Sequence, residues 1–368
     1  MKIKGIIYCC CLLGFVLIAC SLQAQYTING SVEGMSTGRA LLVGDIYEGR
    51  DTLTKVEIKD GKFTMNGRVD EVSCAFLVVE GRMGVRLFLE NNEVFDVRFK
   101  LKEAPEVRGG GRNQQLNREF MQIEEKKMLK LHDTGREFAE ASKNRDTVAI
   151  REIREKQARI LEELEQEKSI FLKRHGNTFF VLHDLARRAL GMSAGDVQEA
   201  FDLCCDELKT TLPGKYITAL LPKLAKIAVG ATVPDFVSIT PEGKEVSLYG
   251  IRSRIKLIDF WSSNCGRCRE ENRATRPIYE RYHARGFEVI SYSLDTKREL
   301  WLKAIADDKL PWIQVSDLGG QKMKIMIENY GIWSLPANLM VDENNRVIAR
   351  NITSEELEKV LPKFLGIE

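Results

Sequence analysis

The chain has 368 residues, of which 44% are hydrophobic and 29% are charged, and its 55 Lys and Arg residues nearly balance 53 Asp and Glu residues. This hydrophobic content excludes a wholly disordered chain, and a net charge of +2 gives no reason to expect binding to nucleic acid or to a strongly acidic partner. The length is sufficient for two or three domains.

Residues 1–20 carry the features of an export signal. A basic start precedes an apolar stretch, residues 6–19, that fits the h-region of a signal peptide and is short for a membrane span. The end of this stretch resembles a bacterial lipobox, which would leave Cys20 as a lipidated N-terminus. Cleavage after Ala24 and a retained membrane helix are the alternatives. We therefore expect a protein of the periplasm or cell envelope of a Gram-negative bacterium, anchored to the membrane if Cys20 is lipidated.

Residues 26–108 are predicted to form an antiparallel β-domain, which we expect to be a small sandwich. Short runs of alternating apolar and polar residues recur, separated by the turn signals Asn29-Gly30, Asp60-Gly61 and Asn66-Gly67. No catalytic constellation occurs in this part of the sequence. Cys74 lies at the start of an apolar strand and is expected to be a buried thiol.

A glycine run at residues 109–111 predicts a hinge, and residues 113–228 are predicted to be helical. One helix is expected to end near Ser142. A second, from Asp146 to about Lys173, has apolar residues at helical spacing and charges on its other face. That charged face is typical of a solvated helix and does not indicate nucleic-acid binding.

The cysteines and histidines of the helical region do not have the spacing of a metal site. Cys204 lies on an apolar stripe and is expected to pack in a core. A disulfide with the adjacent Cys205, or a relay to the cysteine pair described next, is the alternative. His132, His175 and His183 are interpreted as structural or surface residues.

The most informative stretch is an apolar run that ends at a Cys-x-x-Cys. Residues 256–261 predict a strand buried on both faces, and the sequence becomes compatible with a helix from Cys265 onward. Cys265 and Cys268 are therefore expected in the first turn of a helix. Residues three apart in a helix have Cα atoms about 5 to 6 Å apart, which is within the range of a disulfide. We predict a redox-active pair.

The two cysteines are expected to act differently. Cys265 would lie at the helix N-terminus, where unpaired N–H groups favour a thiolate, and Arg267 and Arg269 add positive charge nearby. Cys268, one turn further on, should be more buried and protonated. Cys265 would then attack a disulfide and Cys268 would resolve the mixed disulfide, without a cofactor.

Two structural alternatives fit the pair less well. A disulfide that closes so small a loop removes little entropy from the unfolded chain and stabilises a fold weakly. A zinc site needs about four ligands, and this sequence has a single Cys-x-x-Cys with no second pair or nearby histidine. We therefore expect no metal.

Several segments resemble one protein family. Residues 259–268 resemble the motif of the thioredoxin superfamily, and residues 230–236, 268–271 and 330–336 resemble the entry segment, the post-motif helix and the cis-proline loop of its TlpA/ResA-like branch. The likeness covers residues 229–368 and implies an α/β thioredoxin fold of the AhpC/TSA-thioredoxin-like kind. The preceding β-domain resembles the lipoprotein-type domain of Bacteroidetes envelope proteins.

The resemblance also implies roles for acids near the pair. Asp259 would serve Cys268 as a proton donor and acceptor, although an acid at the exposed end of the sheet is an alternative. Glu271 matches the acid of the post-motif helix, where it would support the site or interact with the dipole of its own helix. Arg267 is a further candidate beside the reactive sulfur.

The cis-proline loop implies a place for the substrate. The Leu335–Pro336 bond is expected to be cis and to present the backbone of Leu335 to an extended substrate. Trp261 and Trp333 are expected beside the motif, either in the core or as substrate contacts.

These features together predict an extracytoplasmic thiol-disulfide oxidoreductase. It would reduce protein or small disulfides and receive electrons from a thiol donor in the envelope. A peroxiredoxin-like peroxidase is an alternative, but the Pro-x-x-x-Thr-x-x-Cys pattern of that family is absent before Cys265. Another is an envelope binding lipoprotein in which the thioredoxin domain is only a scaffold.

Overall fold

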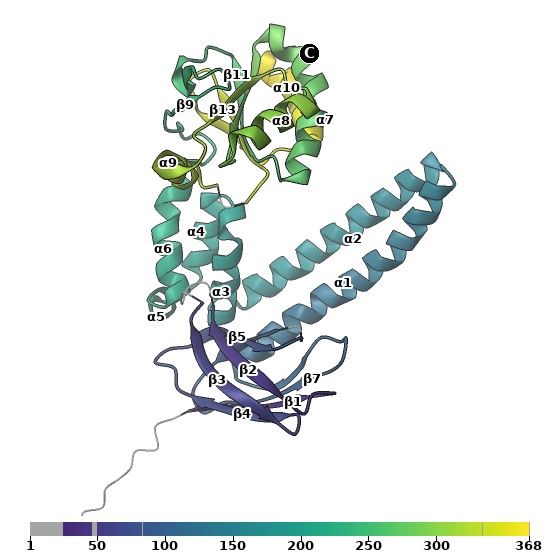
Figure 1. Ribbon diagram of the computed structural model, residues 1–368, viewed down its shortest axis with the longest axis vertical. Coiled ribbons are helices and arrows are strands. Elements are labelled where there is room, and N and C mark those ends of the chain that lie inside the picture. The colour runs from purple at the N-terminus through teal and green to yellow at the C-terminus, as the bar shows by residue number, and fades with distance from the viewer. Residues whose placement is uncertain (1–24, 46–49, 83, 333, 368) are drawn as a thin grey trace, which may run out of the picture. The chain divides into compact units, whose positions relative to one another are not determined.

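The computed structural model describes residues 25–45, 50–82, 84–332 and 334–367 (Figure 1). The chain divides into two compact units, one that ends at Gln115 and one that begins at Leu116. The expected signal segment and Cys20 lie outside the described residues. In the described ranges, none of the helices combines the length and apolar character needed to cross a membrane.

Eight strands form one curled sheet in the N-terminal unit, in the order β6-β5-β2-β3-β4-β1-β7-β8 (Figure 1). They are β1 (Tyr26–Val32), β2 (Thr37–Gly44), β3 (Thr52–Lys59), β4 (Lys62–Gly67), β5 (Ser73–Val79), β6 (Val85–Leu89), β7 (Val94–Phe99) and β8 (Glu106–Gly109). Every neighbouring pair is antiparallel except β1 and β7, which run parallel. The prediction of an antiparallel β-domain is confirmed in its main feature, but the expected sandwich is instead a single curled sheet. Cys74 is buried, as predicted.

Two of the three predicted turns in this unit are wrong, because aromatic rings cover the glycines. Asn29 and Gly30 lie inside β1, where a Cβ on Gly30 would come within 2.0 Å of the Phe63 ring. Gly67 ends β4, and a Cβ there would meet the Tyr26 hydroxyl at 2.2 Å. Both glycines therefore allow a ring to lie across the strand. Asp60 and Gly61 do form the turn between β3 and β4, with φ of 50° and 71°.

Helices follow the β-unit. They are α1 (Arg112–Lys143), α2 (Thr147–Arg174), α3 (Phe179–Arg188), the short 3-10 helix η2 (Ala189–Gly191), α4 (Ala194–Asp202), α5 (Asp206–Lys209) and α6 (Leu212–Ala225). The two long predicted helices are confirmed, and Asp146 caps α2 by accepting hydrogen bonds from two backbone N–H groups. Cys204 is buried, as predicted, and burial raises the pKa of its thiol to about 11. Cys204 and Cys205 are free thiols, so the alternative of a vicinal disulfide is wrong.

The C-terminal part is a mixed α/β domain of the thioredoxin type, as predicted. Its strands are β9 (Val237–Ile239), β10 (Glu245–Ser247), β11 (Ile255–Trp261), β12 (Phe287–Ser293), β13 (Ile313–Ser316), β14 (Ala337–Asp342) and β15 (Val347–Arg350). Its helices are α7 (Gly266–Tyr282), α8 (Arg298–Asp308), α9 (Gly320–Tyr330) and α10 (Ser354–Leu365), with 3-10 turns η3 (Leu248–Gly250) and η4 (His283–Arg285). The sheet order is β10-β9-β13-β12-β11-β14-β15, with β11, β12 and β13 parallel. The sequence analysis did not predict β13.

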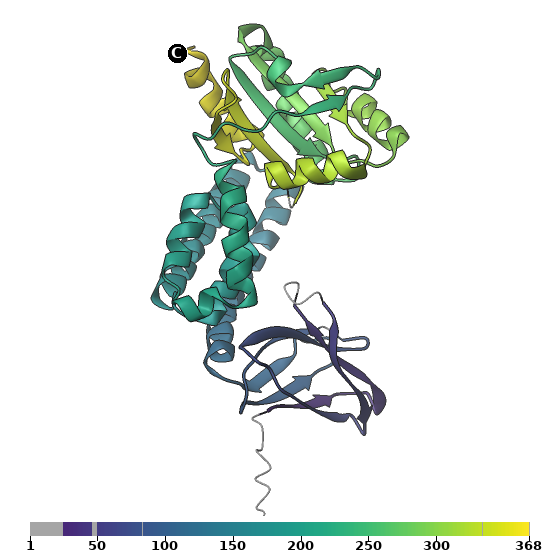
Figure 2. The same ribbon diagram turned by 90° about the vertical axis from the view of Figure 1, so that its left-hand side faces the viewer.

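Helices cover both faces of this sheet. Side chains of α7, α8 and α10 share one core with Leu257 of β11 and Val289 of β12. On the other face, Tyr330 of α9 packs against Phe260 of β11, and α9 crosses in front of the sheet in Figure 2. Side chains alternate between the faces of a strand, so Asp259, two residues after Leu257, points to the α7 side.

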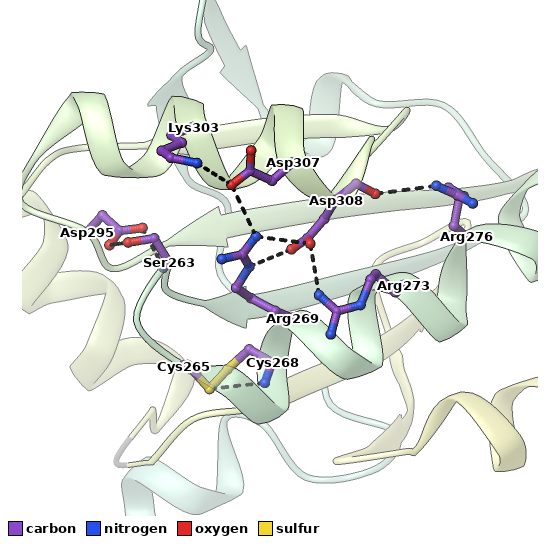
Figure 3. Close-up of polar contacts among 10 residues, drawn as sticks. All are labelled: Ser263, Cys265, Cys268, Arg269, Arg273, Arg276, Asp295, Lys303, Asp307 and Asp308. Atoms are coloured by element: carbon purple, nitrogen blue, oxygen red, sulfur yellow. Dashed lines mark hydrogen bonds and ion pairs between the residues drawn. A yellow bond between two sulfur atoms is a disulfide. The ribbon is translucent and has the colours of Figure 1, made fainter.

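A buried carboxylate joins the start of α7 to the end of α8 (Figure 3). Asp308 is 3% exposed and accepts hydrogen bonds from Arg269 at 2.7 and 3.0 Å and from Arg273 at 2.9 Å. Burial raises the pKa of Asp308, but the bonds from the two arginines outweigh it and the pKa lies below its ordinary value. The ionised carboxylate therefore fixes the first turns of α7.

Removing this charge should destabilise the domain. We expect Asp308→Asn to lower the free energy of unfolding by about 2 kcal/mol at pH 7, because the hydrogen bonds of a buried carboxylate to Arg269 and to the more exposed Arg273 lose their charge. A carboxyl group with a lowered folded-state pKa stabilises the fold above its unfolded pKa and loses this effect as pH falls through the folded value. The difference in free energy of unfolding between Asp308→Asn and the wild type should therefore become smaller below about pH 4. Urea unfolding followed by tryptophan fluorescence measures it, since all 4 tryptophans lie in this domain.

The neighbouring Asp307 provides a matched control. Its side chain is 43% exposed, is paired with Lys303 at 2.7 Å, and lies at the longer distance of 3.7 Å from Arg269. Exposed ion pairs contribute little, so Asp307→Asn should change stability by less than about 1 kcal/mol. Equal effects of the two substitutions at pH 7 would contradict the proposed importance of Asp308.

Candidate active site

The two cysteines of the motif form a disulfide at the start of α7. Their Cα atoms are 5.2 Å apart, as the helical spacing predicted. Cys265 is the N-cap residue, just before the first turn, and its Sγ accepts a hydrogen bond from the N–H of Cys268 at 3.1 Å (Figure 3). The sulfur thus occupies the acceptor position that a Ser or Asp side chain takes at other helix starts.

Access to the two sulfurs differs. Cys265 is half-buried, whereas Cys268 is 1% exposed and belongs to the core shared by α7, α8 and α10. The predicted difference in burial is therefore present in the oxidised pair.

A second buried carboxylate fixes the loop before Cys265. Asp295 lies just beyond β12, is 6% exposed, and accepts hydrogen bonds from the N–H and Oγ–H of Ser263 at 2.9 and 2.6 Å. The hydroxyl of Ser293 donates to the same carboxylate at 2.7 Å. Asp295 was not among the residues predicted from the sequence. It could have been found as an acid that follows the carboxyl end of a parallel strand, because the functional sites of α/β proteins commonly lie at that end.

Asp259 lies on β11 beneath the start of α7 and is 8% exposed. Its burial rules out the alternative of an acid at the exposed end of the sheet. Burial raises the pKa of Asp259 to about 7; a hydrogen bond from the Ser291 hydroxyl at 3.0 Å opposes this rise, and the nearby charge of Glu271 adds to it. A carboxyl group with a pKa near neutrality can both take up and release a proton at physiological pH.

Glu271 connects α7 to the terminal helix. It accepts a hydrogen bond from the backbone N–H of Ser354, the first residue of α10, at 2.9 Å. The structure thus gives this acid a partner at the N-terminus of α10, where a negative charge is stabilised. From the sequence, this acid was expected either to support the site or to interact with the dipole of its own helix.

A cavity of about 240 Å³ brings together five of the predicted site residues. They are Asp259, Arg267, Glu271, Leu335 and Pro336. The Leu335–Pro336 peptide bond is cis, as predicted. The sequence analysis missed the uncharged polar residues of the cavity wall, which include Asn272, Thr275, Ser334, Asn338 and Ser354.

For two predicted neighbours of the motif, the structure decides between alternatives or changes the expected role. Trp261 is 0% exposed and packs in the core, so its side chain does not form a surface that a substrate could contact. Arg269 is bound to Asp308, so most of the positive charge expected from it is compensated. Trp333 lies outside the described residues.

The raised pKa of Asp259 predicts how the free energy of unfolding should change with pH. An acid whose folded-state pKa is raised keeps its proton while the unfolded chain loses it, so stability falls as pH rises from about 4 to about 7. Asp259→Asn removes this loss. We expect the variant to be more stable than wild type by a few kcal/mol at pH 8, with the advantage disappearing near pH 4. Urea unfolding of both proteins between pH 4 and pH 8, followed by tryptophan fluorescence, measures this advantage. If the stability of Asp259→Asn differed from that of the wild type by the same amount at every pH, the raised pKa of Asp259 would be contradicted.

Two parts of the chain match known protein families. Residues 228–363 match the Redoxin family, and residues 26–116 match DUF4369, a domain of unknown function. The C-terminal match contains every predicted residue of the redox site.

Individual relatives are similar to the C-terminal part. The thiol-disulfide oxidoreductase ResA of Bacillus thuringiensis subsp. konkukian is 27% identical over 165 residues, 44% of this chain and 91% of the relative. Peroxiredoxin Q of Sedum lineare is 30% identical over 117 residues, 31% of this chain and 58% of the relative. The thioredoxin domain of a thiol-disulfide oxidoreductase from Bacteroides vulgatus is 31% identical, covering 38% of this chain and 98% of that structure, with a TM-score of 0.36. The family match over residues 228–363 and the similarity to ResA identify the C-terminal part of this chain as a ResA-like thiol-disulfide oxidoreductase domain of the Redoxin family.

Proposed function

We propose that this protein reduces protein disulfides outside the cytoplasm, with Cys265 as the attacking thiolate and Cys268 as the resolving thiol. The observation that carries this proposal is the Cys265–Cys268 pair at the start of α7, together with the buried Asp259 in a cavity that Arg267 and Glu271 of the same helix also line.

The reaction has two exchange steps. In the first, the Cys265 thiolate attacks one sulfur of a substrate disulfide, so that a mixed disulfide forms and one substrate thiolate leaves. In the second, Cys268 attacks the sulfur of Cys265, the pair closes and the other substrate thiolate leaves. Two electrons pass from the pair to the substrate. The disulfide present here is the product of that sequence, and a thiol donor must reduce it before the next cycle.

Asp259 is the proposed acceptor of the proton that Cys268 must lose before the second step. Cys268 is almost fully buried, and burial disfavours a thiolate unless a base removes the proton. Burial raises the pKa of Asp259 to about 7, so the carboxyl group is partly ionised at neutral pH. Transfer could proceed directly or through one water molecule in the cavity that Asp259 lines.

The cis-proline loop is the proposed binding site for the substrate backbone. Leu335 and Pro336 line the cavity beside α7, and Leu335 also packs against the core that contains Cys268. An extended substrate could pair with the backbone here while its disulfide approaches Cys265. Arg267 and Glu271 of the same cavity would contact or orient that substrate.

We further propose that the protein acts in the periplasm or cell envelope, attached through a lipid on Cys20. The sequence of the first 20 residues supports export. Disulfides form readily in such a compartment, so a pair that is kept reduced by a thiol donor would serve to reduce them.

Trapping tests the roles of the cysteines. The variant Cys268→Ala should accumulate substrates bound to Cys265 through a mixed disulfide, because the resolving thiol is missing. Non-reducing electrophoresis followed by mass spectrometry identifies the adducts. The variant Cys265→Ser should lose insulin-disulfide reduction down to the uncatalysed rate.

Controls separate this activity from its alternatives. Cys205 is a half-buried free thiol, so adding Cys205→Ser to the trapping variant should leave the yield of adducts unchanged. A peroxiredoxin-like peroxidase would consume hydrogen peroxide with a peroxidase rate that Cys265→Ser abolishes. If the protein were a binding lipoprotein with an inert thioredoxin domain, Cys265→Ser would leave its function intact and no adducts would form.

A further inference from the structure

A chain of buried hydrogen bonds leads to Asp259 from outside the cysteine motif. The indole Nε1–H of Trp312, which precedes β13, donates to the hydroxyl oxygen of Ser291 at 2.8 Å. The Ser291 hydroxyl in turn donates to Oδ2 of Asp259 at 3.0 Å. Exposure of Trp312, Ser291 and Asp259 is 5%, 0% and 8%, so the hydrogen bonds of this chain lie in the protein interior, where they are stronger than in water.

The chemistry of the three groups fixes the direction of this chain. An indole nitrogen can only donate, and a serine hydroxyl has a single hydrogen. Because Trp312 supplies a hydrogen to the Ser291 oxygen, the serine's own hydrogen remains for Asp259. The oxygen Oδ2 is therefore held as an acceptor, and a proton that Asp259 takes up is directed to Oδ1.

Strand register explains why the carboxyl group and the hydroxyl meet. Asp259 of β11 and Ser291 of β12 are neighbours in the parallel ladder, so both side chains point to the α7 face. Trp312 packs in the core on that same face. The chain of bonds thus joins three separate segments of the domain at one carboxyl group.

Few charged groups surround Asp259. Arg267 and Glu271 of α7 line its cavity, and Cys268 lies on the same helix. The neighbouring strand β14 contributes Asn338, which is uncharged. Helix α10 and the residue before it contribute only uncharged side chains to the cavity wall, and β12 contributes Ser291 and Val289.

We propose that Ser291 and Trp312 are positioning residues that hold Asp259 as a directed proton acceptor for Cys268. This inference rests on the proposed function, because it assumes that Asp259 exchanges a proton with Cys268. The hydrogen bond from Ser291 favours the ionised carboxyl group and opposes the effect of burial on its pKa. Without this bond, a smaller fraction of Asp259 would be ionised at neutral pH and the resolving step would slow.

The resolving step can be observed directly with an aromatic disulfide. When the reduced full-length protein reacts with 5,5′-dithiobis(2-nitrobenzoate), attack by Cys265 releases one coloured thiolate and leaves the other in a mixed disulfide. Attack by Cys268 then releases the second. The rate of this second release, measured by stopped flow between pH 5 and pH 9, reports the ionisation that precedes resolution.

We expect Ser291→Ala to shift the midpoint of this pH profile upward by about one unit, because a hydrogen bond to a charged group is lost. The second release should then be about tenfold slower at pH 6 and nearly unchanged at pH 9. Trp312→Phe should shift the midpoint in the same direction by a smaller amount, since the Ser291 hydroxyl remains but can rotate. In an Asp259→Asn background, neither substitution should cause a further shift.

Trp301 provides a matched control for packing. It lies in the same core cluster, is 1% exposed, and its indole nitrogen has no hydrogen-bond partner among the described residues. Trp301→Phe therefore removes the same atoms as Trp312→Phe without touching the chain of bonds. It should leave the midpoint of the profile unchanged.

The outcomes separate the two proposals. If Asp259→Asn alone leaves the wild-type profile unchanged, the proposed role of Asp259 fails and this inference fails with it. If Asp259→Asn changes the profile but Ser291→Ala does not, or Trp312→Phe behaves as Trp301→Phe does, only the positioning role is overturned.

Discussion

Asp259 is a buried carboxyl group on the α7 face of the sheet, and it shares a cavity wall with the first turns of α7. Burying such a group is unfavourable unless hydrogen bonds or neutralisation compensate. Asp259 has both, through Ser291 and through a pKa raised by burial to about 7. The arrangement depends on strand register, because a slip of one residue in β11 would turn the carboxyl group to the α9 face, away from Cys268.

The sequence was sufficient to predict those parts of the domain whose patterns are local. The strand β11 is buried at every position, which explains why a continuous apolar run predicted it. Thr353 and Glu356 have the local spacing of a capping box, and they form that box at the start of α10. Asp259 is the single acid in the apolar run of β11. An acid at such a position departs from the hydrophobic pattern of a buried strand, and such departures are most often found at functional sites.

Other features depend on contacts between residues far apart in the chain. Asp308 and Arg269 are separated by 39 positions, and nothing local distinguishes this acid at the end of a helix from its solvated neighbour Asp307. Ser291 is an ordinary serine in a strand until the register places it beside Asp259. The strand β13 has only 4 residues, too few for a clear periodicity. At Gly30, a ring from another strand overrides a local turn signal.

The electrostatics around Cys265 are weaker than the sequence suggested, and this shifts the explanation of reactivity toward access. Arg269 is paired with Asp308, and the exposed Arg267 is screened by solvent. A helix N-terminus stabilises a nearby anion by about 0.3 to 1 kcal/mol, which raises the ionised fraction of a thiol only about two- to fivefold. Burial of Cys268 at 1% exposure is a stronger discriminator, because it leaves Cys265 as the sulfur that a bulky disulfide can reach. In the proposed reaction, the order of the two exchange steps therefore follows mainly from geometry, and the second step has the special requirement that a proton be removed from Cys268.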